Sequence, residues 1–250
     1  MRNIATAKLL YRVLALGGLS LCLWAVSART KELQDTFIPV VITDQLPTRA
    51  GIIPIFLSCG QARLSAANRI EEFRCTFKNN TSLNITAANT IYTIVLDNNG
   101  SSASDTNNLT IETLVHPDFR TTSKLIGPGD ETEVGPPGPI TYSNGAVVKA
   151  VQISIDYVQF ENGTSLGPDK EGSRIVNAMR AGAQKYKRWL KAQYALRSQS
   201  VTALAADIEA NESVAADVNE QLGAREYRRR FQKLLQTGET AEIKKALAGN

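Results

Sequence analysis

The sequence predicts an α+β protein whose strands and helices occupy separate segments. An antiparallel immunoglobulin-like β-sandwich is expected over residues 50–168 and an α-helical C-terminal tail over residues 169–250. Upstream of Pro168 apolar side chains alternate with a period of two, and downstream they recur every three to four residues. A basic and then apolar N-terminus adds a signal or anchor helix over residues 1–28, and residues 29–49 are expected to be a linker with a first strand.

The N-terminal segment has the three parts of a secretory signal. Arg2, Lys8 and Arg12 precede an apolar run over residues 13–28, which ends on small side chains. The run is shorter than the roughly 20 apolar residues that cross a bilayer. We therefore expect a cleaved signal and a periplasmic or secreted protein. The alternative is an uncleaved segment that holds the protein to the membrane.

Charge is divided unevenly along the chain. The whole chain has 28 basic and 24 acidic residues, net +4, and without the three cations of residues 1–28 it has 25 and 24, net +1. Residues 29–168 carry 10 basic and 14 acidic side chains, net −4, whereas residues 169–250 carry 15 and 10, net +5. This asymmetry indicates two units with different surfaces.

The first strands of the sandwich are short and rich in β-branched and aromatic residues. Residues 36–43 form one apolar run, and residues 52–59 and 69–79 are expected to pair as a hairpin. Phe73 and Phe77 share one face of the hairpin, while charged side chains occupy the other face. This alternation is typical of an antiparallel strand that covers a core on one side.

Two cysteines remain outside the signal, and the hairpin brings them together. Cys59 and Cys75 each lie eight residues from Ala67, the expected centre of the hairpin, so they stand opposite each other. Opposed residues have Cα atoms about 4.5–5.5 Å apart, which is within disulfide range. An oxidising compartment permits the bond. The sequence thus predicts a disulfide, with two small buried thiols as the alternative.

The middle of the sandwich alternates strands with polar loops. Residues 85–100 are expected to form a strand, residues 97–108 a polar loop, and residues 109–116 and 122–127 two further strands. The Pro/Gly-rich residues 127–139 are expected to be a loop. The side chains expected on the core face of the first of these strands are Tyr92, Ile94 and Leu96.

The last long strand is expected over residues 147–160, before an Asn-Gly hairpin turn and a short return strand. Its expected core face is Val147, Val151, Ile153, Ile155 and Tyr157. Asp169 or Ser173 is then expected to cap the first helix. About seven strands without helices between them favour an immunoglobulin-like sandwich.

Two segments of this region carry a resemblance. "NNTSLNITA" (residues 79–87) and "IDYVQFENGTSLGPD" (residues 155–169) resemble the β-domains of uncharacterised exported bacterial proteins, in which the second segment reads close to IDYVxFxDGTxWGPD. Leu166 stands where that pattern has Trp. The resemblance covers about residues 73–169. It implies a β-domain and export, and it carries no catalytic residue across because that family has no known activity.

The tail reads as four helical segments. A helix over residues 173–199 is followed by one over residues 200–224 that breaks near Asn211, by one over residues 225–238 with Gly238 as C-cap, and by a last short helix. The expected buried stripe of the first helix is Ile175, Met179, Gly182 or Ala183, Tyr186 and Leu190. That of the third is Tyr227, Phe231, Leu234 and Leu235.

Charges in the tail come in blocks. Residues 170–197 hold eight basic residues and one acid, residues 198–220 five acids and no base, and residues 225–233 five bases and one acid. The pattern predicts an antiparallel helical arrangement in which the acidic segment lies beside basic neighbours. Each exposed pair contributes only about 0–1 kcal/mol, but the summed pattern of signs selects the register.

The basic first helix is the candidate membrane or partner surface. It mixes cations with amphipathic aromatic side chains, as interfacial helices do. The candidate residues are Lys185, Tyr186, Lys187, Arg188, Trp189, Lys191 and Tyr194. An anionic membrane would bind this surface, whereas nucleic acid is not expected for an exported protein. The alternative is that the aromatic side chains pack inside the tail.

The sequence shows no set of residues spaced for catalysis. His116 is the one histidine, a triad through His116 and Asp118 lacks a G-x-S-x-G elbow, and no pair of carboxylates is singled out by spacing. We predict no catalytic residue, cofactor or metal; calcium bound by Asp97, Asn99 and Asp105 is a minor alternative. The leading hypothesis is an exported, non-catalytic binding or structural module of the cell envelope with a protein or glycan partner. A peripheral membrane protein using residues 170–197 is the alternative, and a hydrolase the remote one.

Overall fold

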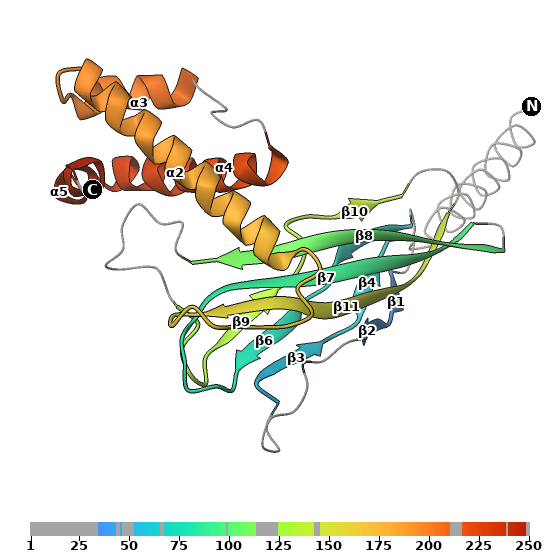
Figure 1. Ribbon diagram of the computed structural model, residues 1–250. Coiled ribbons are helices and arrows are strands. Elements are labelled where there is room, and N and C mark those ends of the chain that lie inside the picture. The colour runs from blue at the N-terminus through green and yellow to red at the C-terminus, as the bar shows by residue number, and fades with distance from the viewer. Residues whose placement is uncertain are drawn as a thin grey trace, which may run out of the picture.

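The protein is described by a computed structural model in which antiparallel sheets are followed by helices, which confirms the α+β class (Figure 1). The described residues are 35–43, 46, 53–65, 68–98, 100–113, 125–142, 146–210, 217–238 and 240–248. The last strand ends at Leu166 and the first described helix begins at Gly172, on either side of Pro168. We call strands β1 to β12 the β part and helices α2 to α5 the helical unit. The predicted signal over residues 1–28 lies outside the described residues.

The largest sheet is built on three long strands. Its order is β12 (Ser165–Leu166), β11 (Val147–Phe160), β7 (Ile85–Asn98) and β8 (Ser101–Glu112), with β2 (Val40–Ile42) pairing β11 in parallel. The other pairings in this sheet are antiparallel. In this order of strands β8 comes last, so it forms one edge of the sheet in the described chain.

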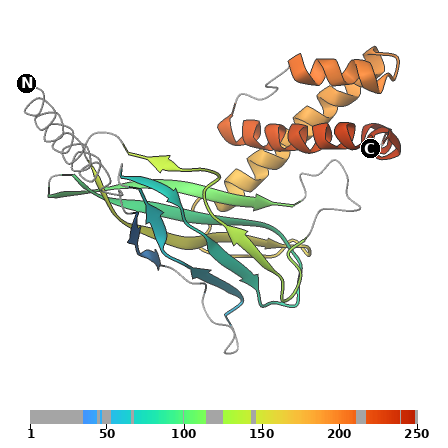
Figure 2. The same ribbon diagram turned by 180° about the vertical axis from the view of Figure 1, so that it is seen from behind.

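Two smaller sheets form from the remaining strands and are seen best from behind (Figure 2). One has the order β1 (Thr36–Ile38), β4 (Ala62–Leu64), β5 (Arg69–Glu72) and β10 (Ile140–Thr141), and the other β3 (Ile55–Cys59), β6 (Cys75–Asn79) and β9 (Glu131–Val134). The predicted hairpin is present, but its two arms are each divided into two strands. Strands β1 and β2 confirm β-structure in the expected linker.

All three sheets contribute to one hydrophobic core. Ile55, Ile70, Ile94 and Ile153 have no exposed surface, and they come from β3, β5, β7 and β11. Burying such side chains is the dominant stabilising contribution to a β-domain, at about 1.5–3 kcal/mol each. The predicted core faces of β6 and β7 are correct, because Cys75, Phe77, Tyr92, Ile94 and Leu96 are all buried, as is Phe73 two residues before β6.

The predicted polar loop over residues 97–108 is wrong for most of its length. Residues 101–108 belong to β8 and pair with β7 in continuous register. Asp97 accepts a hydrogen bond from the Gly100 backbone N–H at 2.9 Å, and Gly100 takes a φ of 86° in the turn. The polar composition misled the prediction because these residues form a largely exposed edge strand rather than a loop.

The same pairing bears on the calcium alternative. Asp105 lies in β8 opposite Ile94, and its carboxylate accepts a hydrogen bond from the Tyr142 hydroxyl at 2.8 Å. Among the described residues no group of three His, Cys, Asp or Glu side chains is placed to hold a metal ion. Asn99 lies outside the described residues.

The face predicted for the last long strand is wrong at both ends. Val147 is 46% exposed and Val148 is buried, because the register with β7 shifts between Val148 and Ala150. A second shift between Ile155 and Tyr157 turns Tyr157 away from the sheet core. Irregularities of this kind insert a residue and reverse the alternation of faces.

The predicted disulfide is present. Cys59 and Cys75 stand opposite each other in the β3–β6 register, as the hairpin centred near Ala67 requires. Their sulfur atoms are 2.06 Å apart and their Cα atoms 4.0 Å apart.

The helical unit comprises α2 (Gly172–Leu196), α3 (Val201–Ala210), α4 (Val218–Thr237) and α5 (Thr240–Ala248). The predicted stripe of α2 is buried, and Gly238 caps α4 with a φ of 71°, as expected. Tyr186, Leu190, Leu204 and Phe231 form the centre of a second core. The ion pairs Arg197–Asp207 and Lys185–Glu220 join the acidic segment to basic α2, in agreement with the charge blocks.

Helices α2 and α4 cross in close contact at two glycines. A Cβ atom on Gly182 would overlap the Glu220 carbonyl, and a Cβ on Gly223 would overlap the Met179 carbonyl. Only glycine therefore permits this approach of the two backbones. The crossing fixes which face of α4 turns toward the β part.

Candidate functional site

The aromatic residues of the candidate membrane or partner surface lie largely inside the helical unit. Tyr186 is 1% exposed, and its ring centroid lies 5.2 Å from that of Trp189 and 6.3 Å from that of Tyr227. Burial raises the pKa of Tyr186 to about 12, against a smaller opposite effect of Arg228. Trp189 and Tyr194 are partly buried against the same core. Their packing corresponds to the alternative stated from the sequence.

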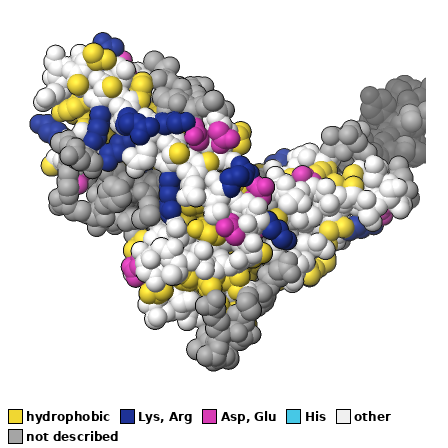
Figure 3. Space-filling view, in the orientation of Figure 1, with side chains coloured by type: hydrophobic (Ala, Val, Ile, Leu, Met, Phe, Trp, Pro, Cys, Tyr) yellow, Lys and Arg dark blue, Asp and Glu magenta, His cyan; other side chains and the backbone are white. Residues whose placement is uncertain are grey.

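The cations of that surface have different environments. Lys185 forms an ion pair with Glu220 of α4. Arg188 is exposed, and Lys187 and Lys191 are partly exposed. Burial and the charge of Lys191 both lower the pKa of Lys187. Basic side chains are visibly more frequent over the helical unit than over the β part (Figure 3).

A buried carboxylate that the sequence did not single out joins the β part to the helical unit. Asp156 of β11 is 1% exposed and accepts hydrogen bonds from the backbone N–H groups of Lys170, Glu171 and Gly172 at 2.8, 3.1 and 2.7 Å. It thus satisfies N–H groups at the start of α2 from a distant strand. The N-cap position of α2 is Glu171 rather than Asp169 or Ser173, the two predicted caps, but Asp169 accepts the Ser173 N–H at 2.8 Å.

The Asp156 site continues across the sheet. The Asn89 amide donates to Asp156 at 3.2 Å and to the Asn108 side-chain oxygen at 3.0 Å, and the Thr110 hydroxyl donates to Asn89 at 2.8 Å. Gly172 leaves no room for a Cβ beside Tyr157. The segment "IDYVQFENGTSLGPD" therefore builds the junction between the last strands and the first helix.

A second contact fixes α2 to the sheet. Arg180 binds the Glu112 carboxylate through Nε at 3.1 and 3.2 Å, and its Nη1 donates to Gln159 at 2.6 Å. The Glu112 side chain is 1% exposed. Breaking a buried ion pair of this kind costs about 3–5 kcal/mol, so α2 is held firmly against β8 and β11.

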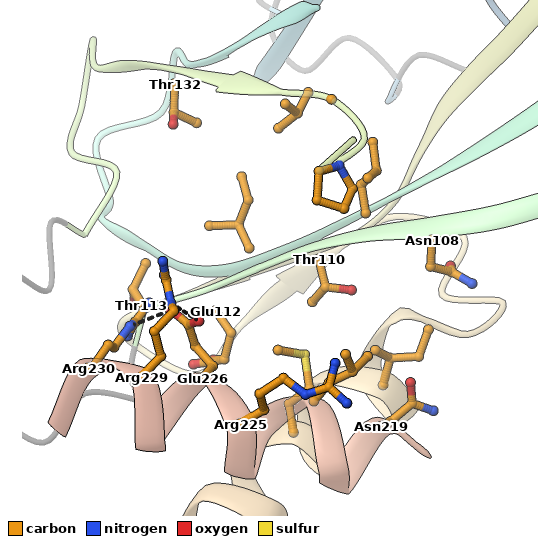
Figure 4. A pocket seen from close by; sticks show the side chains of 18 of the residues that line it. Asn108, Thr110, Glu112, Thr113, Thr132, Asn219, Arg225, Glu226, Arg229 and Arg230 are labelled. Carbon is orange, nitrogen blue, oxygen red and sulfur yellow. Dashed lines mark hydrogen bonds and ion pairs between the residues drawn. The ribbon is translucent and has the colours of Figure 1, made fainter. Parts of the chain in front are cut away.

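The two contacts leave a groove beside the edge of β8. Its volume is about 880 Å³, and β8 lies between β9 on one side and α4 on the other (Figure 4). Residues 108–113 of β8 and the following turn line it along six consecutive positions. Strand β9 and its next turn supply Val134 and Pro137, and α4 supplies Leu222, Arg225 and Arg229.

The arginines of α4 give the groove a positive side. Arg229 and Arg230 bind Glu226 at 2.9 and 2.6 Å, whereas exposed Arg225 has no ion pair within the described chain. Burial tends to raise the pKa of Glu226, but the hydrogen bonds and charges of Arg229 and Arg230 outweigh it and lower that pKa. Arg225 is thus the cation of this wall available to a ligand.

The sequence did not predict the groove, because no local pattern places β8 and β9 beside α4. The expected strand over residues 109–116 covers most of the lining from β8, but residues 131–134, expected to be part of a Pro/Gly loop, form β9. The described lining offers backbone and side-chain hydrogen bonds, positive charge and apolar surface, which are means of binding. His116 and Asp118, considered for catalysis, lie outside the described residues.

Comparison of the chain with protein-family models, with curated proteins and with solved structures gives no match in any of the three. Within the described residues, none of the helices is both long enough and apolar enough to cross a bilayer.

Proposed function

We propose that the protein is an exported, non-catalytic binding module of the cell envelope whose partner occupies the groove between β8, β9 and α4. The observation that carries the proposal is the groove itself, because both parts of the molecule build it. In this proposal the β part is an immunoglobulin-like sandwich that serves as scaffold. The helical unit supplies one wall.

The rigid attachment of the helical unit supports a binding role. Asp156 and the Glu112–Arg180 pair hold α2, and the Gly182–Gly223 crossing holds α4 against α2. A preformed groove loses little conformational entropy when it binds. A partner would therefore meet the walls in their binding positions.

Export is supported by three independent features. Residues 1–28 have the order of a secretory signal. The Cys59–Cys75 disulfide is of a kind that persists outside the cytosol. The resemblance of residues 73–169 to exported β-domains is the third. N-terminal sequencing of the exported product tests this: a start near residue 29 is expected, and an intact Met1 contradicts cleavage.

Site-specific crosslinking in the native envelope tests the binding role. The photoreactive residue p-benzoylphenylalanine replaces Leu222 in the groove or, as control, Val147, which is equally exposed on the β part at 46% against 45%. We expect a discrete crosslinked partner, protein or glycan, from position 222 alone. Equal products from both positions, or robust hydrolytic turnover by the purified protein, would contradict the proposal.

Binding to an anionic membrane is a second candidate, favoured by the cations of α2. Burial and, to a smaller extent, the nearby charge of Lys191 lower the pKa of Lys187, and Arg188 is exposed beside them. Because the aromatic residues pack inside, the attraction would be mainly electrostatic.

Co-sedimentation of the full chain with phosphatidylglycerol vesicles at low salt tests this second candidate. Binding is expected to fall sharply in a Lys187→Glu, Arg188→Glu variant. It should persist in a Lys78→Glu, Lys149→Glu variant, which makes the same charge change on the β part. Equal losses in the two variants, or no vesicle binding at all, would remove the membrane hypothesis.

A further inference from the structure

The floor of the groove is the free edge of a β-sheet. Strand β8 ends the order β12-β11-β7-β8, so one of its edges has no neighbouring strand in the described chain. The Thr113 N–H donates to the Thr86 carbonyl at 3.0 Å. By the alternation of an antiparallel ladder, Ile111 and Leu109 also bond to β7, whereas the backbone N–H and C=O groups of Asn108 and Thr110 point away from it. These groups are available to another strand.

The two faces of β8 meet chemically different walls. Leu109 and Ile111 pair with Thr90 and Ala88 and pack on the β core, on the side of β9. Thr110 and Asn108 lie on the opposite face, toward α4, as Figure 4 shows for both side chains.

A strand added at this edge would continue both faces, with alternate side chains pointing to each wall. On the α4 side they would meet Arg225 and exposed Leu222. On the β9 side they would meet Val134 and Pro137, and Glu133 there disfavours a carboxylate.

We propose that the groove binds an extended polypeptide segment of about six residues, which adds as a strand to the edge of β8 and alternates acidic with apolar side chains. The length follows from the six lining positions 108–113. Main-chain hydrogen bonds supply affinity in this mode, and the pockets for alternate side chains supply specificity. The inference rests on the proposed binding function and narrows its partner to a protein.

A peptide fits these features better than a glycan. The edge presents donors and acceptors at the repeat of an extended chain, which a peptide backbone matches at every second residue. Arg225 would make a charge-assisted hydrogen bond to a carboxylate on the ligand. The apolar side chains of the ligand would cover exposed Pro137, which lies beside the buried Val134, and a sugar ring with its hydroxyl groups would cover it less well.

Binding of labelled hexapeptides to the full exported chain, measured by fluorescence anisotropy, tests the proposal. The probe alternates Glu and Val, and its charge control alternates Lys and Val. Two further probes carry N-methyl groups on the backbone nitrogens of the Glu residues alone or of the Val residues alone. Only one of these two sets of N–H groups faces β8, so we expect one methylated probe to lose binding and the other to keep it.

The matched protein variants are Arg225→Glu and Lys233→Glu, which reverse one exposed charge on the same helix inside and outside the groove. Arg225→Glu is expected to weaken binding of the Glu-Val probe by about 10-fold or more, since hydrogen bonds to charged groups contribute roughly 1.5–3 kcal/mol. Lys233→Glu is expected to change it less than about twofold. The Lys-Val probe is expected to bind at least about 10-fold more weakly than the Glu-Val probe.

Several outcomes would overturn the inference. Equal binding of both methylated probes excludes strand addition, and equal effects of the two protein variants exclude the role of Arg225. A concentration-dependent dimer that the probe disrupts would identify a second copy as the occupant. If no probe binds below about 1 mM while position 222 still crosslinks a partner, the strand-addition proposal fails and the binding function stands. If no probe binds and position 222 crosslinks no partner, both the strand-addition proposal and the proposed binding function fail.

Discussion

The β part and the helical unit are stabilised in different ways. Within the described chain, the core of the β part comprises 24 buried hydrophobic residues and that of the helical unit comprises 11. Each buried contact is therefore a larger share of the stability of the helical unit. The β part adds long antiparallel ladders and a disulfide. The helical unit depends on the close crossing of α2 and α4 and on its attachment through Asp156. A single substitution should therefore affect the helical unit more.

The largest expected effect is at the helix crossing. Gly182→Ala or Gly223→Ala places a Cβ where the facing backbone already lies, so α2 and α4 must separate. Alanine normally favours a helix over glycine by about 1 kcal/mol. We nevertheless expect a loss of about 3 kcal/mol or more from overpacking. Without residues 1–28 Trp189 is the one tryptophan, so its fluorescence during urea unfolding reports on this unit.

The control for the crossing is Gly138→Ala in the β part. No atom lies within 4 Å of a Cβ built on Gly138, so this change should leave the unfolding midpoint nearly unaltered. A gain of stability in Gly182→Ala, as propensity alone would give, would show that the helices do not cross at this distance.

The second effect tests the stability of the β part. Replacing both Cys59 and Cys75 by Ala removes a link across 16 residues, for which loop-closure entropy predicts about 3 kcal/mol. The loss should appear in the β-sheet signal of far-UV circular dichroism. Trp189 fluorescence at moderate urea should remain native. If the fluorescence transition shifts as far as the sheet signal, the two regions unfold as one cooperative unit.

The third effect concerns the junction. Asp156→Ala leaves the N–H groups of Lys170, Glu171 and Gly172 without their buried acceptor, and we expect a cost of about 2–3 kcal/mol. The comparison is Asp217→Ala, which removes the exposed cap of α4 and should cost about 1 kcal/mol. Chemical denaturation of both variants measures the difference. Equal costs would mean that the buried position of Asp156 contributes nothing beyond ordinary capping.

The sequence predicted what depends on local pattern. The change of period near Pro168, the buried stripe of α2 and the opposition of Cys59 and Cys75 follow from spacing alone, and all three are present. It failed where long-range pairing overrides composition. Residues 101–108 look like a loop, but the 14-residue strand β7 provides a partner for each of them.

The candidate site was less predictable than the fold. Asp156 looks in the sequence like any polar residue of an alternating strand, and only the register shift beside Tyr157 and the return of the chain at Gly172 bury it. The groove requires β8, β9 and α4 together, and these are far apart in the chain. No local spacing encodes that arrangement.

The smallest expected effect is the pH dependence of α4. Glu226 has a folded-state pKa below the ordinary value of 4.5, because Arg229 and Arg230 outweigh its burial. Its ionised form therefore stabilises the helical unit above pH 4.5, and this contribution disappears as the pH falls through the lower folded-state value. A partly exposed pair of this kind contributes up to about 1 kcal/mol. Urea unfolding followed by Trp189 fluorescence should show wild type more stable than Glu226→Gln at pH 7, by a difference that shrinks as the pH falls below 4.5. A difference that persists in acid would mean that Glu226 acts through packing rather than through its charge.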